Sequence, residues 1–123
     1  MDFQNQGGKS VQVVSTEPDK VHHVASNAEY DSLMATPGKL VVVEFSAEWC
    51  GPCRAMAPRF AAASNQYSQA LFIHVDIDKL SDLPDSKAIR SVPTFKFYKN
   101  GAFITDFVGA SAEKLKSTIE ANL

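Results

Sequence analysis

The order of apolar and polar residues predicts five strands from residue 21 onward. Residues 40–45 are almost continuously apolar and β-branched, a pattern typical of a central strand that is covered on both faces. Asn100-Gly101 separates two shorter apolar runs and predicts a tight hairpin between them. The predicted strands are residues 21–24, 40–45, 71–77, 94–98 and 103–108.

Helical spacing of apolar residues predicts the segments between these strands. Ser26, followed three residues later by Glu29, indicates a capping box in which each side chain bonds the other residue's backbone N–H at a helix start. We also expect a short helix at residues 84–89. Two further sets of apolar residues lie at helical spacing: Met56, Phe60, Ala63 and Tyr67, and then Ala112, Leu115, Ile119 and Leu123.

The predicted element order is β-α-β-α-β, a short helix, and then β-β-α. A strand, a long helix and a second strand imply a parallel pair with a right-handed crossover, and the late hairpin adds an antiparallel pair. We therefore expect an α/β fold, a central mixed sheet covered by helices on both faces. Residues 1–20 are mostly polar and predict a flexible N-terminal extension before one domain at residues 21–123.

Composition mainly excludes other classes of protein. The 123 residues, 45% of them hydrophobic and 21% charged, suit one globular domain. A net charge of −2 without a basic stripe argues against nucleic-acid binding. No apolar run approaches the ~20 residues of a membrane helix, and no targeting signal is recognisable, so we expect a cytoplasmic protein.

The two cysteines, Cys50 and Cys53, are the candidate chemistry. A Cys-x-x-Cys pair indicates either a redox dithiol or half of a zinc site. Zinc needs four ligands, and the sequence has neither a second cysteine pair nor histidines at finger spacing, so we expect no metal. A third interpretation is a pair of thiols that packs in the core. The place between a buried strand and a helix start, where side chains are usually exposed, argues against it.

The position of Cys50 favours its thiolate form. The preceding strand ends near Ser46 and the helix begins near Cys50, so unpaired N–H groups and the helix dipole favour negative charge there. Only the thiolate attacks a disulfide. Cys53 lies one turn later, and we expect it to be more buried and to attack the mixed disulfide that Cys50 forms. Gly51-Pro52 fixes the short loop so that the two sulfurs can bond.

Residues 43–54, with Trp49-Cys50-Gly51-Pro52-Cys53 at their centre, resemble the active-site segment of the thioredoxin family. Residues 91–95 resemble the family's cis-proline segment, and residues 98–101 and 107–110 resemble its later turn and glycine. These motifs occur in the family's order and at similar separations. The resemblance implies the thioredoxin fold, a three-layer α/β/α structure with a mixed, mostly five-stranded sheet and about four helices.

The resemblance also implies a protein-disulfide reductase, with Cys50 as the attacking thiol and Cys53 as the resolving thiol. It implies no bound cofactor but a reversible disulfide, re-reduced by a thioredoxin reductase with electrons from NADPH. Gly51-Pro52 favours a reductant, because thioredoxin, at about −270 mV, is more reducing than protein disulfide isomerase, at about −180 mV. We expect a monomer. Its implied partners are disulfide-containing clients such as peroxiredoxins or reductases.

Pro93 is the second feature that the resemblance interprets. As the family's cis-proline it would lie beside the dithiol, whereas the sequence alone favours a trans proline that opens an edge strand. The backbone of Val92 would then pair with an extended client segment.

An alternative for Trp49 is packing in the core. The apolar docking face implied around the dithiol consists of Trp49, Pro52, Val92, Gly109 and Ala110.

Glu44 departs from the family, which usually has Asp at the matching position. A carboxylate in an apolar strand is costly to ionise, so we expect burial to raise the pKa of Glu44. In the family this group moves a proton to or from the buried cysteine, and our hypothesis gives Glu44 that role toward Cys53. The alternative is a longer side chain that turns to a polar partner or to solvent.

His74 takes the place of a lysine that neighbours the buried carboxylate in many bacterial members of the family. Either it tunes the charge of Glu44, or it is an ordinary hydrogen-bonded, partly buried histidine. We expect structural roles for His22 and His23, because adjacent strand residues point to opposite faces and cannot both line one site.

Two other functions stay open at this point. A redox-dependent binding or regulatory module on the same fold would use the state of the dithiol to control affinity. An oxidase or isomerase is disfavoured by Gly51-Pro52 and by the lack of a secretory signal.

Overall fold

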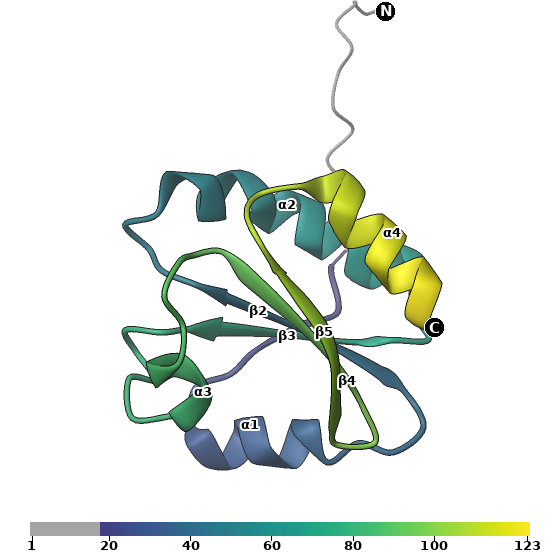
Figure 1. Cartoon of the computed structure of the whole chain (residues 1–123), viewed down its shortest axis with the longest axis horizontal. Coiled ribbons are helices and arrows are strands. Elements are labelled where there is room, and N and C mark those ends of the chain that lie inside the picture. Colours follow the sequence, from purple (N-terminus) through teal and green to yellow (C-terminus); the bar gives the residue numbers. More distant parts are fainter. Residues whose placement is uncertain (1–17) are drawn as a thin grey trace, which may run out of the picture.

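A five-stranded mixed sheet forms the centre of the structure, a computed structural model that describes residues 18–123 (Figure 1). The predicted extension lies outside the described residues, apart from residues 18–20. The strand order is β1-β3-β2-β4-β5, with β1 and β2 parallel to β3 and with β4 and β5 added antiparallel. The strands are β1 (Val21–His23), β2 (Leu40–Ser46), β3 (Leu71–Asp76), β4 (Thr94–Lys99) and β5 (Ala102–Val108).

Four helices cover the sheet and complete three layers, so the predicted architecture is confirmed. Helices α2 and α4 lie on one face, and α1 and α3 lie on the other (Figure 1). Their bounds are α1 (Asn27–Met34), α2 (Gly51–Gln66), α3 (Pro84–Lys87) and α4 (Ala112–Asn122).

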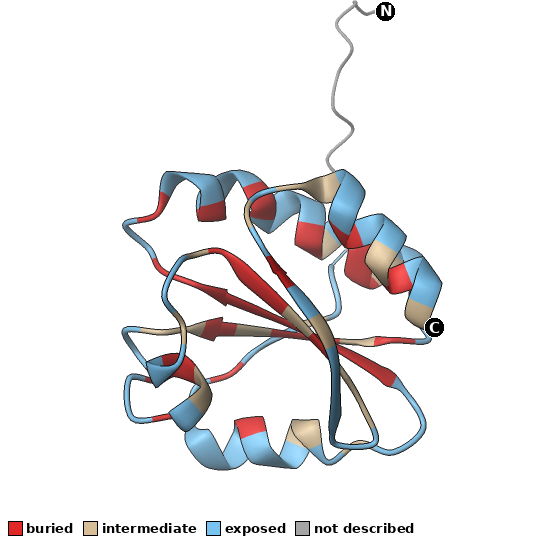
Figure 2. Cartoon of the chain, in the orientation of Figure 1, coloured by how far each residue is buried: buried red, intermediate tan, exposed pale blue. Residues whose placement is uncertain are grey.

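Strand β2 is central because both of its faces are apolar. All of its residues are buried (Figure 2). Leu40 and Val42 belong to the core cluster under α2 and α4, whereas Val41 and Val43 belong to the cluster that includes Tyr30 of α1. Since alternate side chains share a face, Glu44 points to the α2 side of the sheet, with Leu40 and Val42.

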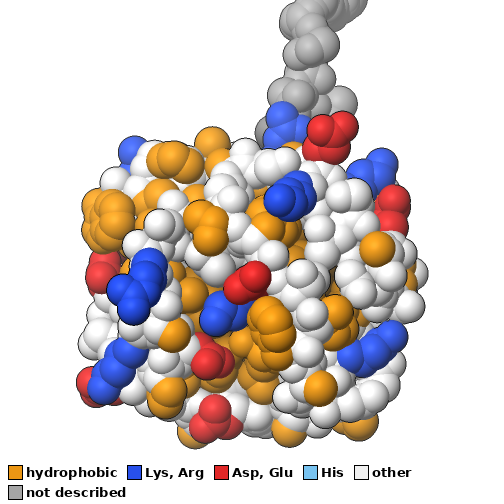
Figure 3. All heavy atoms as spheres, viewed as in Figure 1, with side chains coloured by type: hydrophobic (Ala, Val, Ile, Leu, Met, Phe, Trp, Pro, Cys, Tyr) orange, Lys and Arg blue, Asp and Glu red, His pale blue; other side chains and the backbone are white. Residues whose placement is uncertain are grey.

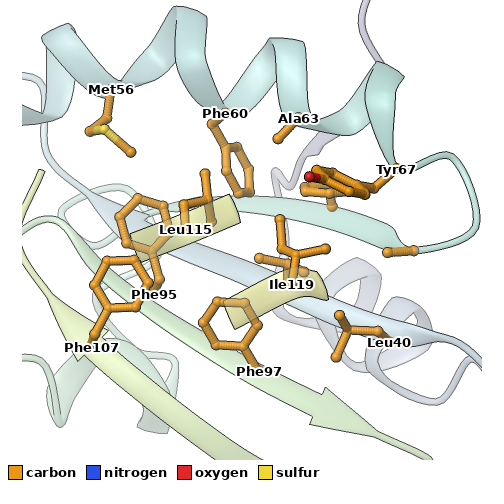
Figure 4. Close-up of a cluster of buried hydrophobic side chains, with 13 residues drawn as sticks. Leu40, Met56, Phe60, Ala63, Tyr67, Phe95, Phe97, Phe107, Leu115 and Ile119 are labelled. Carbon is orange, nitrogen blue, oxygen red and sulfur yellow. The ribbon is translucent and has the colours of Figure 1, made fainter. Parts of the chain in front are cut away.

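The larger core cluster packs α2 and α4 against the aromatic residues of the sheet. Phe60 of α2 and Ile119 of α4 point toward Phe95 and Phe97 of β4 (Figure 4). Full burial of one such side chain contributes about 1.5–3 kcal/mol. The prediction for Leu123 is wrong: it is the C-cap residue after the end of α4, not part of the buried helix face, and it is 45% exposed.

Local signals in the sequence fix two element ends. The Ser26 hydroxyl accepts from Glu29 N–H at 3.1 Å, as predicted, but Glu29 accepts from Ala25 N–H rather than from Ser26 N–H, because its carboxylate reaches one residue further back. At the hairpin, Asn100 and Gly101 both have positive φ, 53° and 79°, the conformation that a two-residue turn of this hand requires.

The surface carries charges of both signs. On the face shown in Figure 3, Lys and Arg side chains are interspersed with Asp and Glu side chains. Among residues 18–123, no helix is both long enough and apolar enough to cross a membrane.

Candidate functional site

The two cysteines form a disulfide at the N-terminus of α2. Cys50 is the N-cap residue and Cys53 lies in the first turn, with their Cα atoms 5.2 Å apart. Cys53 N–H donates to Cys50 Sγ at 3.2 Å, so a backbone donor that the helix leaves free is directed at this sulfur. Within residues 18–123 no three metal-ligating side chains gather at one place. The paired sulfurs therefore support the redox interpretation rather than the zinc interpretation.

The burial of the two cysteines corrects one prediction. Cys53 is not the more buried residue, since Cys50 is 3% exposed and Cys53 is 5% exposed. The side chain of Cys50 turns inward, packs with Ala47, and places Sγ 3.6 Å from the carbonyl oxygen of Val92. The sequence argument assumed that exposure would distinguish this pair from thiols packed in the core. Both cysteines are buried, so exposure does not distinguish them, but the disulfide does.

The segment around Pro93 borders the dithiol. The Val92–Pro93 peptide bond is cis, so the alternative of a trans proline is wrong. Gly109 N–H donates to the carbonyl of Pro93 at 2.9 Å, which joins the start of β4 to the end of β5. Gly109 has a φ of +117°, a conformation that favours glycine.

Most residues predicted for the docking face are accessible. Trp49 is 68% exposed, so the alternative of core packing is wrong, and its indole N–H donates to Asp78 Oδ2 at 2.9 Å. Of the other docking residues, Pro52 and Ala110 are exposed, and Val92 and Gly109 are half-buried. Gly51, predicted to tune the potential, is exposed, and Pro93 is buried. Val108, which pairs with Thr94 in the sheet and is 61% exposed, is a neighbouring apolar residue that the sequence argument missed.

Glu44 lies in the interior on the side of β2 that faces α2. It is 2% exposed, and its Oε2 has no hydrogen-bond partner among the described residues. Burial raises the pKa of Glu44 to about 8, in the predicted direction. The alternative of a side chain turned to solvent is wrong.

A cavity of about 570 Å³ connects Glu44 with Cys53, since both residues line it. Ser46, His74 and His23 line it as well. His74 Nε2 lies 2.5 Å from Ser46 Oγ, and His74 Nδ1 lies 3.0 Å from His23 Nδ1. Burial, and then the neighbouring His23, lower the pKa of His74. His74 is therefore the hydrogen-bonded, partly buried histidine of the second interpretation.

Two residues near the site were missed by the sequence argument. Ser46 lies two positions after Glu44 on one strand, so period-two alternation was a usable signal for placing both on one face. His23 reaches His74 because β1 and β3 run parallel with these two residues in register. That register depends on the fold, and no local pattern around His23 indicates it.

The comparisons with known proteins agree with this geometry. The chain matches the family model described as Thioredoxin over residues 21–121. It is 55% identical to Thioredoxin-3 of Dictyostelium discoideum over 104 residues, covering 85% of this chain and 98% of the relative. It is 47% identical to Thioredoxin-1 of Schizosaccharomyces pombe over 103 residues, covering 84% and 99%. Among solved structures, a thioredoxin from Nicotiana alata is similar, with a TM-score of 0.80, 34% identity, and coverage of 87% of this chain and 96% of that chain. The chain belongs to the thioredoxin family, and it is a thiol–disulfide oxidoreductase.

Proposed function

We propose that this protein reduces disulfide bonds in client proteins and is re-reduced by a thioredoxin reductase with electrons from NADPH. The observation that carries the proposal is the Cys50–Cys53 pair at the N-terminus of α2, with Cys53 N–H directed at Cys50 Sγ. In the reduced protein this N–H would donate to a thiolate, and hydrogen bonds to a charged acceptor are stronger than neutral ones. The helix dipole favours the same charge.

The reduction proceeds by two exchanges between sulfur atoms. The Cys50 thiolate attacks one sulfur of the client disulfide, the bond between the two client sulfurs breaks, and the departing client thiolate takes up a proton. The Cys53 thiolate then attacks Cys50 Sγ, and the bond from Cys50 to the client breaks. The second client thiolate takes up a proton, so the client leaves with two thiols; its two electrons come from the Cys50–Cys53 dithiol, which is oxidised to the disulfide.

Glu44 accepts the proton of the Cys53 thiol in this proposal. Its support is that the two side chains line one cavity and that Glu44 has a carboxylate oxygen free of partners among the described residues. A pKa of about 8 lies near the operating pH, where a group both takes up and releases protons readily.

Clients dock on the face around Cys50 in this proposal. Trp49 supplies exposed apolar surface on one side, and Ala110 supplies it on the other. Val92 offers backbone groups to an extended client segment, and its carbonyl already lies beside Cys50 Sγ. Gly51 and Pro52 leave the approach to the disulfide open and tune its potential, while Gly109 holds Pro93 in place.

The setting that we propose is the cytoplasm, where a monomer serves disulfide-containing clients such as peroxiredoxins or reductases. Thiols in that compartment are kept reduced, which suits a protein whose working form is a dithiol.

The test is the reduction of insulin disulfides with NADPH and a thioredoxin reductase, followed by the loss of NADPH absorbance. We expect turnover in the wild type and none in Cys50→Ser. If a dithiol that dithiothreitol reduces gives no turnover, another electron donor or the binding module is the better explanation. The Cys50→Ser, Cys53→Ser double variant then separates these two, because a binding module keeps its biological activity without either thiol.

A further inference from the structure

A line of hydrogen-bonding side chains runs from the buried sheet to the surface beside β1. Ser46 is 6% exposed, His74 is half-buried and His23 is exposed, so accessibility rises along the line. The contacts are 2.5 Å from Ser46 Oγ to His74 Nε2 and 3.0 Å from His74 Nδ1 to His23 Nδ1. At its inner end the line shares the cavity and the same side of the sheet with Glu44, because His74 and Glu44 are partners in the β2–β3 register.

A hydroxyl and a neutral imidazole can each both donate and accept a hydrogen bond, and His74 has a partner at each ring nitrogen. With a proton on Nδ1, His74 donates to His23 and accepts from Ser46; with the proton on Nε2, both bonds reverse. Moving one proton into the line at Ser46 and one out at His23 converts one arrangement to the other. The geometry therefore suits proton transfer.

The cavity lies apart from the face on which clients dock in our proposal. Among the described residues, none of Trp49, Pro52, Val92, Gly109 and Ala110 lines the cavity. On the β1 side, the cavity is lined by His23, which is exposed to solvent. A cavity of about 570 Å³, lined by the polar side chains of Glu44, Ser46 and His74 among apolar residues, also has room for water to bridge Glu44 and the histidine.

We propose that Ser46, His74 and His23 carry protons between Glu44 and solvent while a client occupies the docking face. This inference rests on the proposed disulfide reduction. The need for such a path follows from burial, which raises the pKa of Glu44 to about 8. Near neutral pH, Glu44 holds a proton in most molecules, and it must release that proton before it can accept the one from Cys53.

The proton balance is closed at each step. The Glu44 carboxyl gives its proton through the cavity to the line, and His23 releases one proton to solvent. The Glu44 carboxylate then takes the proton of the Cys53 thiol, and the Cys53 thiolate attacks Cys50 Sγ. The client thiolate that leaves takes its proton from solvent on the docking side, and no electrons pass through the histidines.

The other charged groups around His74 come from several elements. Asp76 raises the pKa of His74, while His23 and Lys79 lower it. Burial, the largest cause, also lowers the pKa of His74, and the net lowering keeps the imidazole neutral near neutral pH, the form that can both accept and donate. The remaining charged residues that line the cavity are Asp19, Glu48 and Arg54.

The test measures a single oxidation of the reduced protein by excess chromogenic disulfide, in weakly buffered solution across a pH series. We expect His74→Ala to slow the reaction about tenfold near neutral pH, less than the 10²–10⁴-fold of direct acid–base catalysis. Added imidazole should restore the rate, since the enlarged cavity admits it. His74→Asn keeps hydrogen-bonding groups but takes up no proton; we expect the same loss without rescue by imidazole. His22→Asn, on the exposed neighbour in β1, is the control and should match the wild type.

Each outcome decides the inference. Restoration of His74→Ala by imidazole supports it. A wild-type rate and pH profile in His74→Ala overturns it, as does a loss that imidazole leaves unchanged, since that indicates packing alone. If His74→Ala does not fold, His74→Asn decides: a rate slowed near neutral pH that returns to the wild-type rate well above pH 8, where Glu44 is already ionised, supports the line, and a wild-type rate near neutral pH or an equal loss at every pH overturns it. A wild type that reduces no disulfide refutes both this inference and the proposed function, whereas an active wild type with unaffected variants refutes this inference alone.

Discussion

The two sides of Cys53 differ in how the chain builds them. On the docking side, backbone geometry sets the surface: the cis bond at Pro93, the positive φ of Gly109, and the N–H of Gly109 on the Pro93 carbonyl. On the cavity side, the backbone is ordinary strand, and side chains from three neighbouring strands, β1, β3 and β2, meet instead. There Glu44 is buried without a partner on Oε2 among the described residues, beside the histidine line.

This difference separates two requirements of the disulfide reduction that we propose. A docking face must accept many clients, so it offers exposed apolar surface and backbone groups rather than a specific polar pattern. Proton transfer needs particular titratable atoms at short distances, which fixes side-chain identity. Variants on the docking side should therefore change client affinity, whereas variants on the cavity side should change pH dependence.

The largest effect should come from removing the sulfur that joins the two sides. In Cys53→Ser, Cys50 still attacks the client, but no second thiolate releases it, so turnover should fall to the level of the blank. A covalent complex with the client should accumulate and disappear on treatment with dithiothreitol. Mass spectrometry under non-reducing conditions detects it, and Cys50→Ser is the control that should form none. If the Cys53→Ser sample contained no covalent complex with the client, Cys53 would not be the resolving thiol.

The next effect tests the cost of the buried carboxyl. The folded-state pKa of Glu44, about 8, exceeds its ordinary value of 4.5, so the folded state binds the proton more tightly than the unfolded chain. Glu44 thus costs nothing from ionisation below about pH 4, where it is protonated in both states. The cost grows as pH rises from 4.5 and is complete above 8.

Glu44→Gln should therefore gain stability relative to the wild type as pH rises through this window. At about 1.4 kcal/mol for each pKa unit, the gain approaches about 5 kcal/mol. Chemical denaturation of the oxidised proteins at about pH 4 and about pH 9 measures it. The stability difference between the two proteins should be the same at both pH values only if Glu44 is not desolvated. In this variant, the rate of disulfide reduction should also lose the change near pH 8 that the ionisation of Glu44 causes.

The sequence, read with its resemblance to the thioredoxin family, predicted the docking side better than the cavity side, for a physical reason. Backbone requirements are local, so the Gly-Pro loop, Val92–Pro93 and Gly109 leave recognisable motifs. The Asn100-Gly101 turn and the apolar run of β2 are local in the same way, and the strands they predicted are present. The contact of His23 with His74 joins residues 51 positions apart, and it depends on the register of two parallel strands.

The sequence also could not predict that the side chain of Cys50 turns inward. A helix N-terminus predicts which charge is favoured there, but the exposure of its first side chain depends on what covers it. Here Ala47 and the Val92 segment cover the sulfur, and the latter comes from a distant part of the chain.

A smaller effect should follow from removing exposed apolar surface on the docking side. Trp49→Ala should raise the KM for a protein client about tenfold, the loss expected for an aromatic contact worth more than 1 kcal/mol. Its rate with a small chromogenic disulfide should hardly change, and its stability should stay within about 0.5 kcal/mol, because the ring is 68% exposed. Phe103→Ala is the matched control, an exposed aromatic at the other end of β5 from Val108. Equal effects of the two substitutions on KM would mean that the docking face does not include Trp49.

The last prediction compares two glycines of the site, Gly109 and Gly51. A Cβ at Gly109 meets no atom within 4 Å, yet its φ of +117° is strained for any L side chain. We expect Gly109→Ala to lower stability by about 1–3 kcal/mol, the range for a residue held in such a conformation. In Gly51→Ala, the new Cβ would lie 3.8 Å from Arg54 Nη2 in ordinary helical backbone, so stability should be unchanged or slightly raised. Thermal unfolding of both oxidised variants makes the comparison, and Gly109→Ala should also raise the KM for a protein client, because its N–H holds the Pro93 carbonyl. A Gly109→Ala protein as stable as Gly51→Ala would show that backbone conformation at this position does not shape the docking side.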